Sequence, residues 1–200
     1  MGIARRTLLI AAATVFAATA AHAQAIKTDL PDLVIGKPDA PVVIEEYASL
    51  TCNHCAAFHN DVLPQLKAKY IDTGKVRFVY RDYPLNELAV GAAMLARCGD
   101  GSKREAIVGA LFKTQETWAF KAKSPLQELY KLGLQFGFKQ TEMEGCLSNE
   151  IMFGAIVAQR DEFDAKVKVE GTPTFVINGK KLEGPSNLAG FDKALAGLVK

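Results

Sequence analysis

Cys52 and Cys55, with Asn53 and His54 between them, are the residues of this chain whose types and spacing predict chemistry most directly. Two thiols three positions apart can close a small disulfide ring and open again to a dithiol. The apolar run at 42–47 is typical of a buried strand and ends just before the pair, and a helical pattern follows it. A strand before such a pair and a helix after it is the setting of a redox-active dithiol. The motif therefore predicts thiol–disulfide exchange.

The two cysteines are expected to play different roles. Cys52 falls at the start of the helix, where unpaired backbone N–H groups and the helix dipole favour an anion. His54 can add a positive charge or a hydrogen-bond donor nearby. Cys55 lies one turn further, points to the same side but deeper, and should keep the higher pKa. We expect Cys52 to be the reactive thiol of the reduced protein, and thiol–disulfide exchange itself needs no cofactor.

A metal site is the alternative use of these thiols. His59 is seven positions after Cys52 and four after Cys55, so all three can lie on one helical face. Zinc ribbons, however, usually supply a second cysteine pair at short spacing, and Cys98 and Cys146 are far from each other. We therefore expect no metal, and we expect His59 to be a solvated helix residue near the site.

Two further residues have both a structural and a functional interpretation. Glu46 lies on the strand before the motif, and the alternation along that run does not show whether Glu45 or Glu46 points inward. Pro173, in the sequence Gly171-Thr172-Pro173, begins another strand-like run. Proline is tolerated at the first residue of a strand, so this position alone does not indicate a binding site.

The N-terminus predicts export. Arg5 and Arg6 precede an apolar stretch from 8 to about 20, and an A-x-A sequence follows at 21–23. This order predicts a signal peptide over 1–23, cleaved after about Ala23. The apolar stretch is shorter than the ~20 residues that a membrane-spanning helix needs. No cysteine lies at the cleavage site, which disfavours a lipid-attached protein.

Composition and charge narrow the class of protein. The chain has 24 Lys and Arg residues; removal of Arg5 and Arg6 leaves 22, which equals the 22 Asp and Glu residues. A formally neutral mature protein gives no reason to expect nucleic-acid binding. With 200 residues and 49% hydrophobic content, we expect one domain or one domain with an insertion. Export and an even cysteine count favour a structural disulfide between Cys98 and Cys146, with two free buried thiols as the alternative.

The periodicity of apolar residues, together with residues typical of turns and helix ends, predicts the elements around the motif. A helix is expected from about Cys52 to Tyr70, with Ser49 or Thr51 as its N-cap. Pro64 should kink or divide this helix. The turn at 72–74 then leads to a strand over 76–80.

A block of four or five helices is expected from Glu87 to about Val167, because apolar residues recur there at helical spacing. A hairpin should follow, with strands at 174–177 and 180–183 joined by an Asn-Gly turn. A terminal helix is expected over 191–199. The helical block thus interrupts an α/β unit that is completed only after it.

This order, with Cys52-x-x-Cys55 at the first helix and Thr172-Pro173 before the hairpin, resembles the DsbA-like family of exported thiol:disulfide oxidoreductases. The resemblance covers about Leu33 to Leu198 and includes Glu46, His54 and the stretch from Phe78 to Pro84. It implies an α/β fold: a thioredoxin-like central sheet with an inserted all-helical domain. The mature domain would cover 24–200 and the insertion about 86–168.

The resemblance also implies roles for site residues. Glu46 would be a buried carboxylate beneath Cys55 that helps to move protons during exchange. The Thr172–Pro173 bond would be cis and would face Cys52, so that the backbone of Thr172 pairs with an extended substrate. Asn53 stands where proline is common in this motif, and Thr172 stands where valine is common.

The expected function is that of a periplasmic, monomeric oxidase that introduces disulfides into reduced exported proteins. The resemblance implies a membrane, quinone-linked, DsbB-like protein as the partner that reoxidises it. A disulfide reductase or isomerase is the alternative within the same chemistry, because threonine before the proline is more usual in isomerases. A copper or zinc carrier using Cys52, Cys55 and a histidine is the alternative from a different class.

Overall fold

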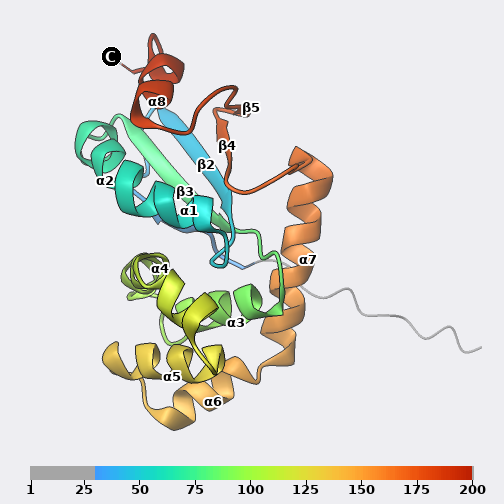
Figure 1. The fold of residues 1–200 in the computed structure, drawn as a ribbon. Helices are drawn as coiled ribbons and strands as arrows, with labels where there is room; N and C mark the ends of the chain where they lie inside the picture. Colours follow the sequence, from blue (N-terminus) through green and yellow to red (C-terminus); the bar gives the residue numbers. More distant parts are fainter. Residues whose placement is uncertain (1–29, 200) are drawn as a thin grey trace, which may run out of the picture.

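The structure, a computed structural model, describes residues 30–199, and the signal peptide predicted for 1–23 lies outside this range. The described residues contain a five-stranded sheet in the order β1-β3-β2-β4-β5 (Figure 1). Its central pair, β2 and β3, is parallel, whereas β1, β4 and β5 each pair antiparallel with their neighbours. The strands are β1 Leu33–Ile35, β2 Val42–Ala48, β3 Val76–Asp82, β4 Thr174–Ile177 and β5 Lys180–Lys181.

The sequence predicted four of these strands and missed β1. Three residues are too few to display an alternating pattern, and Val34 at its centre is half exposed. The predicted hairpin between β4 and β5 is confirmed, because Asn178 and Gly179 both have positive φ, as a type I′ turn requires. The Asn178 side chain also accepts a hydrogen bond from the backbone N–H of Val43 at 2.8 Å, which fixes the turn against β2.

A continuous helical run follows β2, and it alternates between α and π geometry. Pro64 lies in the first turn of α2, where a missing N–H is tolerated, so the run changes from π to α geometry there but is not divided. The predicted N-caps are wrong: Cys52 itself is the N-cap, and Ser49 instead accepts hydrogen bonds from the backbone N–H groups of Thr51 and Leu85. The segments are α1 Asn53–Ala57, η1 Phe58–Val62, α2 Leu63–Leu66 and η2 Lys67–Ile71.

The helices between β3 and β4 form a layer below the sheet, and α7 returns the chain towards β4 (Figure 1). The C-terminal helix begins earlier than predicted because the Asn187 side chain caps it, accepting a hydrogen bond from the N–H of Gly190 at 2.9 Å. These helices are α3 Glu87–Ala96, α4 Arg104–Lys113, η3 Glu116–Lys121, α5 Pro125–Gln135, α6 Gln140–Leu147, α7 Glu150–Val167 and, after β5, α8 Leu188–Leu195.

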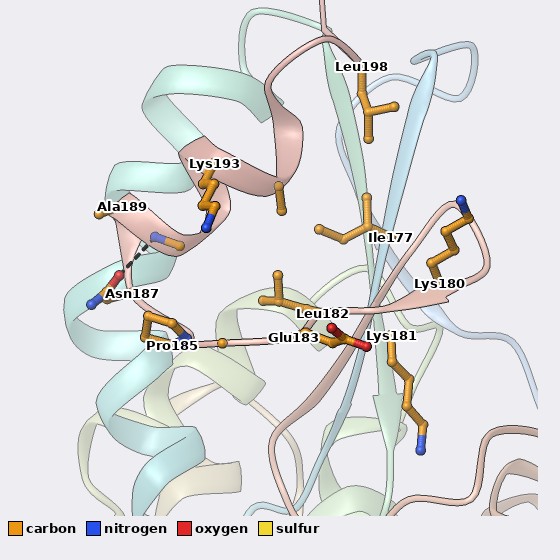
Figure 2. Close-up of a pocket in the computed structure, with 13 residues that line it drawn as sticks. Ile177, Lys180, Lys181, Leu182, Glu183, Pro185, Asn187, Ala189, Lys193 and Leu198 are labelled. Carbon is orange, nitrogen blue, oxygen red and sulfur yellow. Dashed lines mark hydrogen bonds between the residues drawn. The ribbon is translucent and has the colours of Figure 1, made fainter.

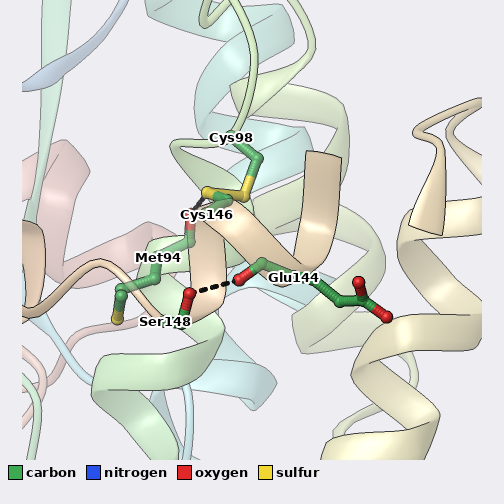
Figure 3. The surroundings of a disulfide bond; sticks show 5 residues. All are labelled: Met94, Cys98, Glu144, Cys146 and Ser148. Carbon is green, nitrogen blue, oxygen red and sulfur yellow. Dashed lines mark hydrogen bonds between the residues drawn. A yellow bond between two sulfur atoms is a disulfide. The ribbon is translucent and has the colours of Figure 1, made fainter. Parts of the chain in front are cut away.

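Two sets of contacts hold the helical layer together and against the sheet. Asp82, at the end of β3, lies 2.7 Å from Arg97 Nη2 and 3.0 Å from Arg104 Nη2, with all three side chains almost fully buried. Cys98, just after α3, and Cys146 of α6 form a disulfide with Cα atoms 5.9 Å apart (Figure 3). Buried charge therefore links the end of β3 to the helices, and a covalent bond links two segments within the helical layer.

Candidate functional site

Cys52 lies where β2 leads into the helical run, and its sulfur caps that helix. The backbone N–H of Cys55 donates to Cys52 Sγ at 3.4 Å, and the Cys52 carbonyl accepts the first helical bond, from Ala56, at 3.1 Å. The Cys52 side chain is only slightly exposed, and Cys55 is fully buried. The segment after β2 therefore places the Cys52 sulfur at the start of the helix, whereas the Cys55 sulfur is buried in the first helical turn.

The pKa of the Cys52 thiol is lowered to about 5. The largest cause is hydrogen bonding from the side chain of Cys55, followed by the side chain of Thr172 and the backbone N–H groups of Cys55 and His54, while burial acts against them. All of these donors favour negative sulfur over neutral sulfur. At neutral pH, Cys52 in the reduced protein is therefore a thiolate.

Cys55 has the opposite character. Burial raises the pKa of its thiol, and the side chain of Cys52 and the charge of Glu46 raise it further. Cys55 therefore remains a thiol at any physiological pH. The two sulfurs differ in the direction that the sequence predicts, because one lies at the helix terminus and the other beneath it.

Thr172 lies beside Cys52, although 120 positions separate them in sequence. In the protonated form, Cys52 Sγ donates to the carbonyl oxygen of Thr172 at 3.2 Å, and the Thr172–Pro173 bond is cis. A carbonyl can only accept, so this hydrogen bond is lost when Cys52 ionises. The Thr172 carbonyl is then left next to the thiolate.

Glu46 is the glutamate of β2 that points inward. Its side chain is fully buried, whereas Glu45 lies on the other face and forms a 2.8 Å ion pair with Arg81. Burial raises the pKa of Glu46, the neighbouring His59 lowers it, and the charge of Cys52 raises it. One carboxylate oxygen of Glu46, Oε1, is buried and has no hydrogen-bond partner among residues 30–199.

His59 is not solvated, and that prediction is wrong. Its Nε2 lies 2.7 Å from Glu46 Oε2, and its side chain is only 5% exposed. The ring stacks on Phe112 of α4 with centroids 4.0 Å apart, because the helical face that carries Cys55 faces the sheet and α4. The spacing of four from the buried Cys55 was the available signal that His59 would point the same way.

The active-site turn, residues 50–55, includes the exposed His54 and is contacted by the buried Gln115. His54 is exposed, and it contributes to the site through its backbone N–H. Gln115 is buried, and its Nε2 donates to the carbonyls of Leu50 at 2.9 Å and Cys52 at 3.0 Å. The sequence carried no signal for Gln115, because a glutamine more than sixty positions away fits no motif.

Two hollows lie near the β4–β5 hairpin. The smaller, of about 230 Å³, is lined by Pro173, Thr174 and Phe175 and adjoins the cis bond. The larger, of about 590 Å³, lies between the hairpin and α8 (Figure 2). The larger hollow contains none of the predicted site residues, so the smaller one is the better candidate for contact with a substrate chain.

Two further properties of residues 30–199 concern clusters of metal-ligating side chains and the length and polarity of the helices. Within this range no group of three or more His, Cys, Asp or Glu side chains is placed to hold a metal ion. The Nε2 atom of His59, which the metal alternative would need, faces Glu46. Over the same range, each helix is too short or too polar to cross a membrane.

Comparison with known proteins gives consistent matches. A family model described as thioredoxin matches residues 28–196. A protein of Rickettsia bellii, provisionally named protein-disulfide oxidoreductase, is 34% identical over 175 residues, which cover 84% of this chain and 66% of the relative. A Rickettsia prowazekii protein of the same provisional name is also 34% identical, with 84% and 63% covered. The chain thus spans about two thirds or less of these curated relatives.

Solved structures match over most of their length. The crystal structure of Wolbachia pipientis alpha-DsbA1 is 32% identical, with 84% of this chain and 92% of that chain covered and a TM-score of 0.77. The oxidised BdbD of Bacillus subtilis has a TM-score of 0.72 over 87% of this chain and 94% of that chain. At 22% identity, the second match supports the fold alone.

Proposed function

Because this chain belongs to the thioredoxin family, among its DsbA-like thiol:disulfide oxidoreductases, we propose that it exchanges disulfides with protein thiols through Cys52 and Cys55. The observation that carries the proposal is the opposite environment of the two sulfurs. The pKa of Cys52 is lowered to about 5, and that of the buried Cys55 is raised. A dithiol arranged in this way has one good leaving group and one protected thiol.

The exchange begins when a substrate thiolate attacks Cys52 Sγ of the Cys52–Cys55 disulfide. The S–S bond breaks, and Cys55 leaves with the electron pair and takes up a proton. A second substrate thiolate then attacks the substrate sulfur that is bound to Cys52, which leaves as a stable thiolate. The substrate dithiol is oxidised by two electrons and the enzyme disulfide is reduced by two.

The direction that we propose is oxidation. Stabilising the Cys52 thiolate stabilises the reduced protein, which makes the disulfide a stronger oxidant. His54 assists through its backbone N–H and through the charge or donor of its ring. Reductase or isomerase activity is the second candidate, and the presence of Thr172 before Pro173 is the observation that favours it.

The substrate would lie against the backbone of Thr172 and the hollow lined by Pro173. An extended chain that pairs with a free backbone edge brings its own thiol beside Cys52. We propose reduced exported proteins as substrates and the periplasm as the compartment, on the basis of the signal peptide predicted over 1–23. A monomer reoxidised by a quinone-linked, DsbB-like membrane protein completes the proposal, with Cys98–Cys146 as a structural disulfide.

The test is transfer of a disulfide to a reduced, unfolded protein such as reduced ribonuclease A. The oxidised protein should remove two thiols per chain and become a dithiol. Cys52→Ser should be inactive. Cys55→Ser cannot form the Cys52–Cys55 disulfide, but when its Cys52 is first joined to glutathione by a disulfide, a ribonuclease thiolate should displace glutathione from Cys52 and accumulate as a mixed disulfide. A Cys98→Ala, Cys146→Ala double variant is the matched control and should keep the activity. Equal thiol loss with wild type and Cys52→Ser would refute the proposal.

A further inference from the structure

A buried acid–base pair lies beneath the reactive dithiol, and the exchange steps described above leave its histidine without a role. Glu46 of β2 and His59 of η1 meet at 2.7 Å with side chains 0% and 5% exposed. Glu46 raises the pKa of Cys55, and the charge of Cys52 raises the pKa of Glu46, so the pair is electrostatically coupled to both sulfurs. His59 also lies one helical turn after the buried Cys55 and on the same helical face, so the pair lies on the side of the helix where Cys55 must gain or lose a proton.

The surroundings of the pair give no structural reason for its polarity. The His59 ring stacks on Phe112 and meets Tyr80 and Phe58 edge-on, with centroids 5.6 Å apart in both cases. Apolar side chains of similar volume in place of a buried ion pair are often neutral or stabilising. Glu46 Oε1 also remains buried without a partner, which costs further stability. A buried group retained against these costs calls for a functional explanation.

We propose that His59 is a positioning residue that holds the Glu46 carboxyl group ready to exchange a proton with Cys55. The inference rests on the dithiol exchange proposed above. His59 occupies Oε2 through its Nε2, which leaves Oε1 as the oxygen at which a proton can be gained or lost. Within residues 30–199, His59 is the hydrogen-bond partner of the Glu46 carboxyl group. Without it, no hydrogen bond from this range would stabilise the carboxylate that forms when Glu46 loses its proton.

The proton balance follows the two directions of the exchange. When a substrate thiolate attacks Cys52, the departing Cys55 sulfur takes one proton from Glu46. The Glu46–His59 pair is left with one proton fewer and regains it from solvent. In the reverse step, the Cys55 thiol gives its proton to Glu46, and the Cys55 thiolate attacks Cys52 and expels the bound partner as a thiolate.

Other charged groups around the pair bear on its pH dependence. At the start of the helical run, these groups are Cys52, the N-cap, and Cys55 of α1, and both interact with the charge of Glu46. Tyr80 of β3 is buried, and burial is the largest cause of its raised pKa. The charges of Asp82, Glu46 and Cys55 raise this pKa further, whereas Arg104 of α4 lowers it. Tyr80 therefore remains neutral at physiological pH and does not compete with Glu46 for the proton of Cys55.

The test isolates the step made by Cys55. Glutathione is attached to Cys52 at acidic pH, the pH is raised, and the release of glutathione by Cys55 is followed across a pH series. His59→Gln, which keeps a hydrogen-bonding group but removes the titratable ring, should slow release about 10-fold or more near neutral pH and change its pH profile, since positioned acid–base groups contribute about 10²-fold or more. His59→Lys, which restores a cation, should recover part of the rate.

Two comparisons separate this role from a structural one. Because His59 acts through Glu46, a Glu46→Gln, His59→Gln double variant should be no slower than Glu46→Gln alone. The rate of Cys52 alkylation should change far less than the rate of glutathione release. The proposal would be overturned if the double variant released glutathione more slowly than Glu46→Gln alone. It would also be overturned if His59→Gln kept the wild-type rate and pH profile.

A measurement on the unaltered protein covers the case in which a variant fails to fold. The NMR shifts of the His59 ring nitrogens should follow the titration of the Glu46 carboxyl carbon, and the shifts of both groups should differ between the oxidised and reduced forms. Independent titration, or identical behaviour in both redox states, would contradict the inference even if exchange occurs. A wild-type protein that releases no glutathione at any pH would instead contradict the proposed function itself.

Discussion

At the scale of residues, the chemistry depends on how two identical side chains are placed. Cys52 accepts hydrogen bonds at a helix start, whereas Cys55 is enclosed beneath it and faces the charge of Glu46. The sequence predicted this difference, because a helix start directly after a strand fixes which thiol meets the free N–H groups. It did not predict that His59 is buried against Glu46, because that contact depends on how the helix packs on the sheet and on α4.

Selective alkylation tests this difference between the sulfurs. In the reduced protein at about pH 6, Cys52 is mostly thiolate and Cys55 is a thiol, so iodoacetamide should label Cys52 first, since the thiolate is the nucleophile. Peptide mapping after partial labelling identifies the modified residue. A preference for Cys55 would reverse the roles assigned here.

At the scale of elements, the site is assembled from segments far apart in the chain. β2 supplies Glu46, the helix start supplies both cysteines, and Thr172, two residues before β4, supplies the carbonyl beside Cys52. The order of β2, β3, the helical block, β4 and β5 along the chain was predictable from periodicity and turn signals. β1 and the contact of Gln115 with the active-site turn were not, because a three-residue edge strand and a single buried amide leave no periodic pattern.

Gln115 should matter for the stability of the active-site turn. Gln115→Ala removes two hydrogen bonds to the carbonyls of Leu50 and Cys52 in a buried setting. The free energy of unfolding should fall by about 1–3 kcal/mol, the cost of leaving buried acceptors unsatisfied. Denaturant unfolding measures this, with Gln135→Ala on the exposed end of α5 as the control that should change little. Equal stability of the two variants would show that the contact is dispensable.

The Cys98–Cys146 bond should stabilise the helical layer without tuning the exchange. It closes a separation of 48 positions, and its loss should lower the free energy of unfolding by up to about 4 kcal/mol in the chain-entropy model. The Cys98→Ala, Cys146→Ala double variant, unfolded in urea with the Cys52–Cys55 pair oxidised in both proteins, gives the value. A changed Cys52–Cys55 reduction potential in this variant would show that the second disulfide also acts on the redox site.

At the scale of the whole molecule, the redox state and folding stability are coupled through Cys52. The pKa of Cys52 falls from 9.0 to about 5 on folding of the reduced protein. A lowered pKa contributes stability that is present above the unfolded value and is lost as the pH falls through the folded value. The oxidised protein lacks this contribution because its sulfurs do not titrate.

The stability of the reduced form relative to the oxidised form should therefore decrease with acidification. The difference in unfolding free energy, reduced minus oxidised, should be more favourable to the reduced form at about pH 8 than at about pH 5. Burial, the largest cause of the raised pKa of Glu46, acts in both forms, so its contribution largely cancels from the difference. Denaturant unfolding of both forms at each pH measures it, and a difference that is constant or that rises on acidification would contradict the lowered pKa.

The reduction potential of the Cys52–Cys55 pair tests the account most directly. The protein is equilibrated with glutathione buffers of graded ratio, and the fraction reduced is determined by trapping the free thiols. Because folding stabilises the Cys52 thiolate, the potential should lie well above the value of about −270 mV for thioredoxin, towards the value of about −120 mV for DsbA. A potential at or below that of thioredoxin would mean that the disulfide is too stable for the chain to act as an oxidant, and would contradict the proposed direction of exchange.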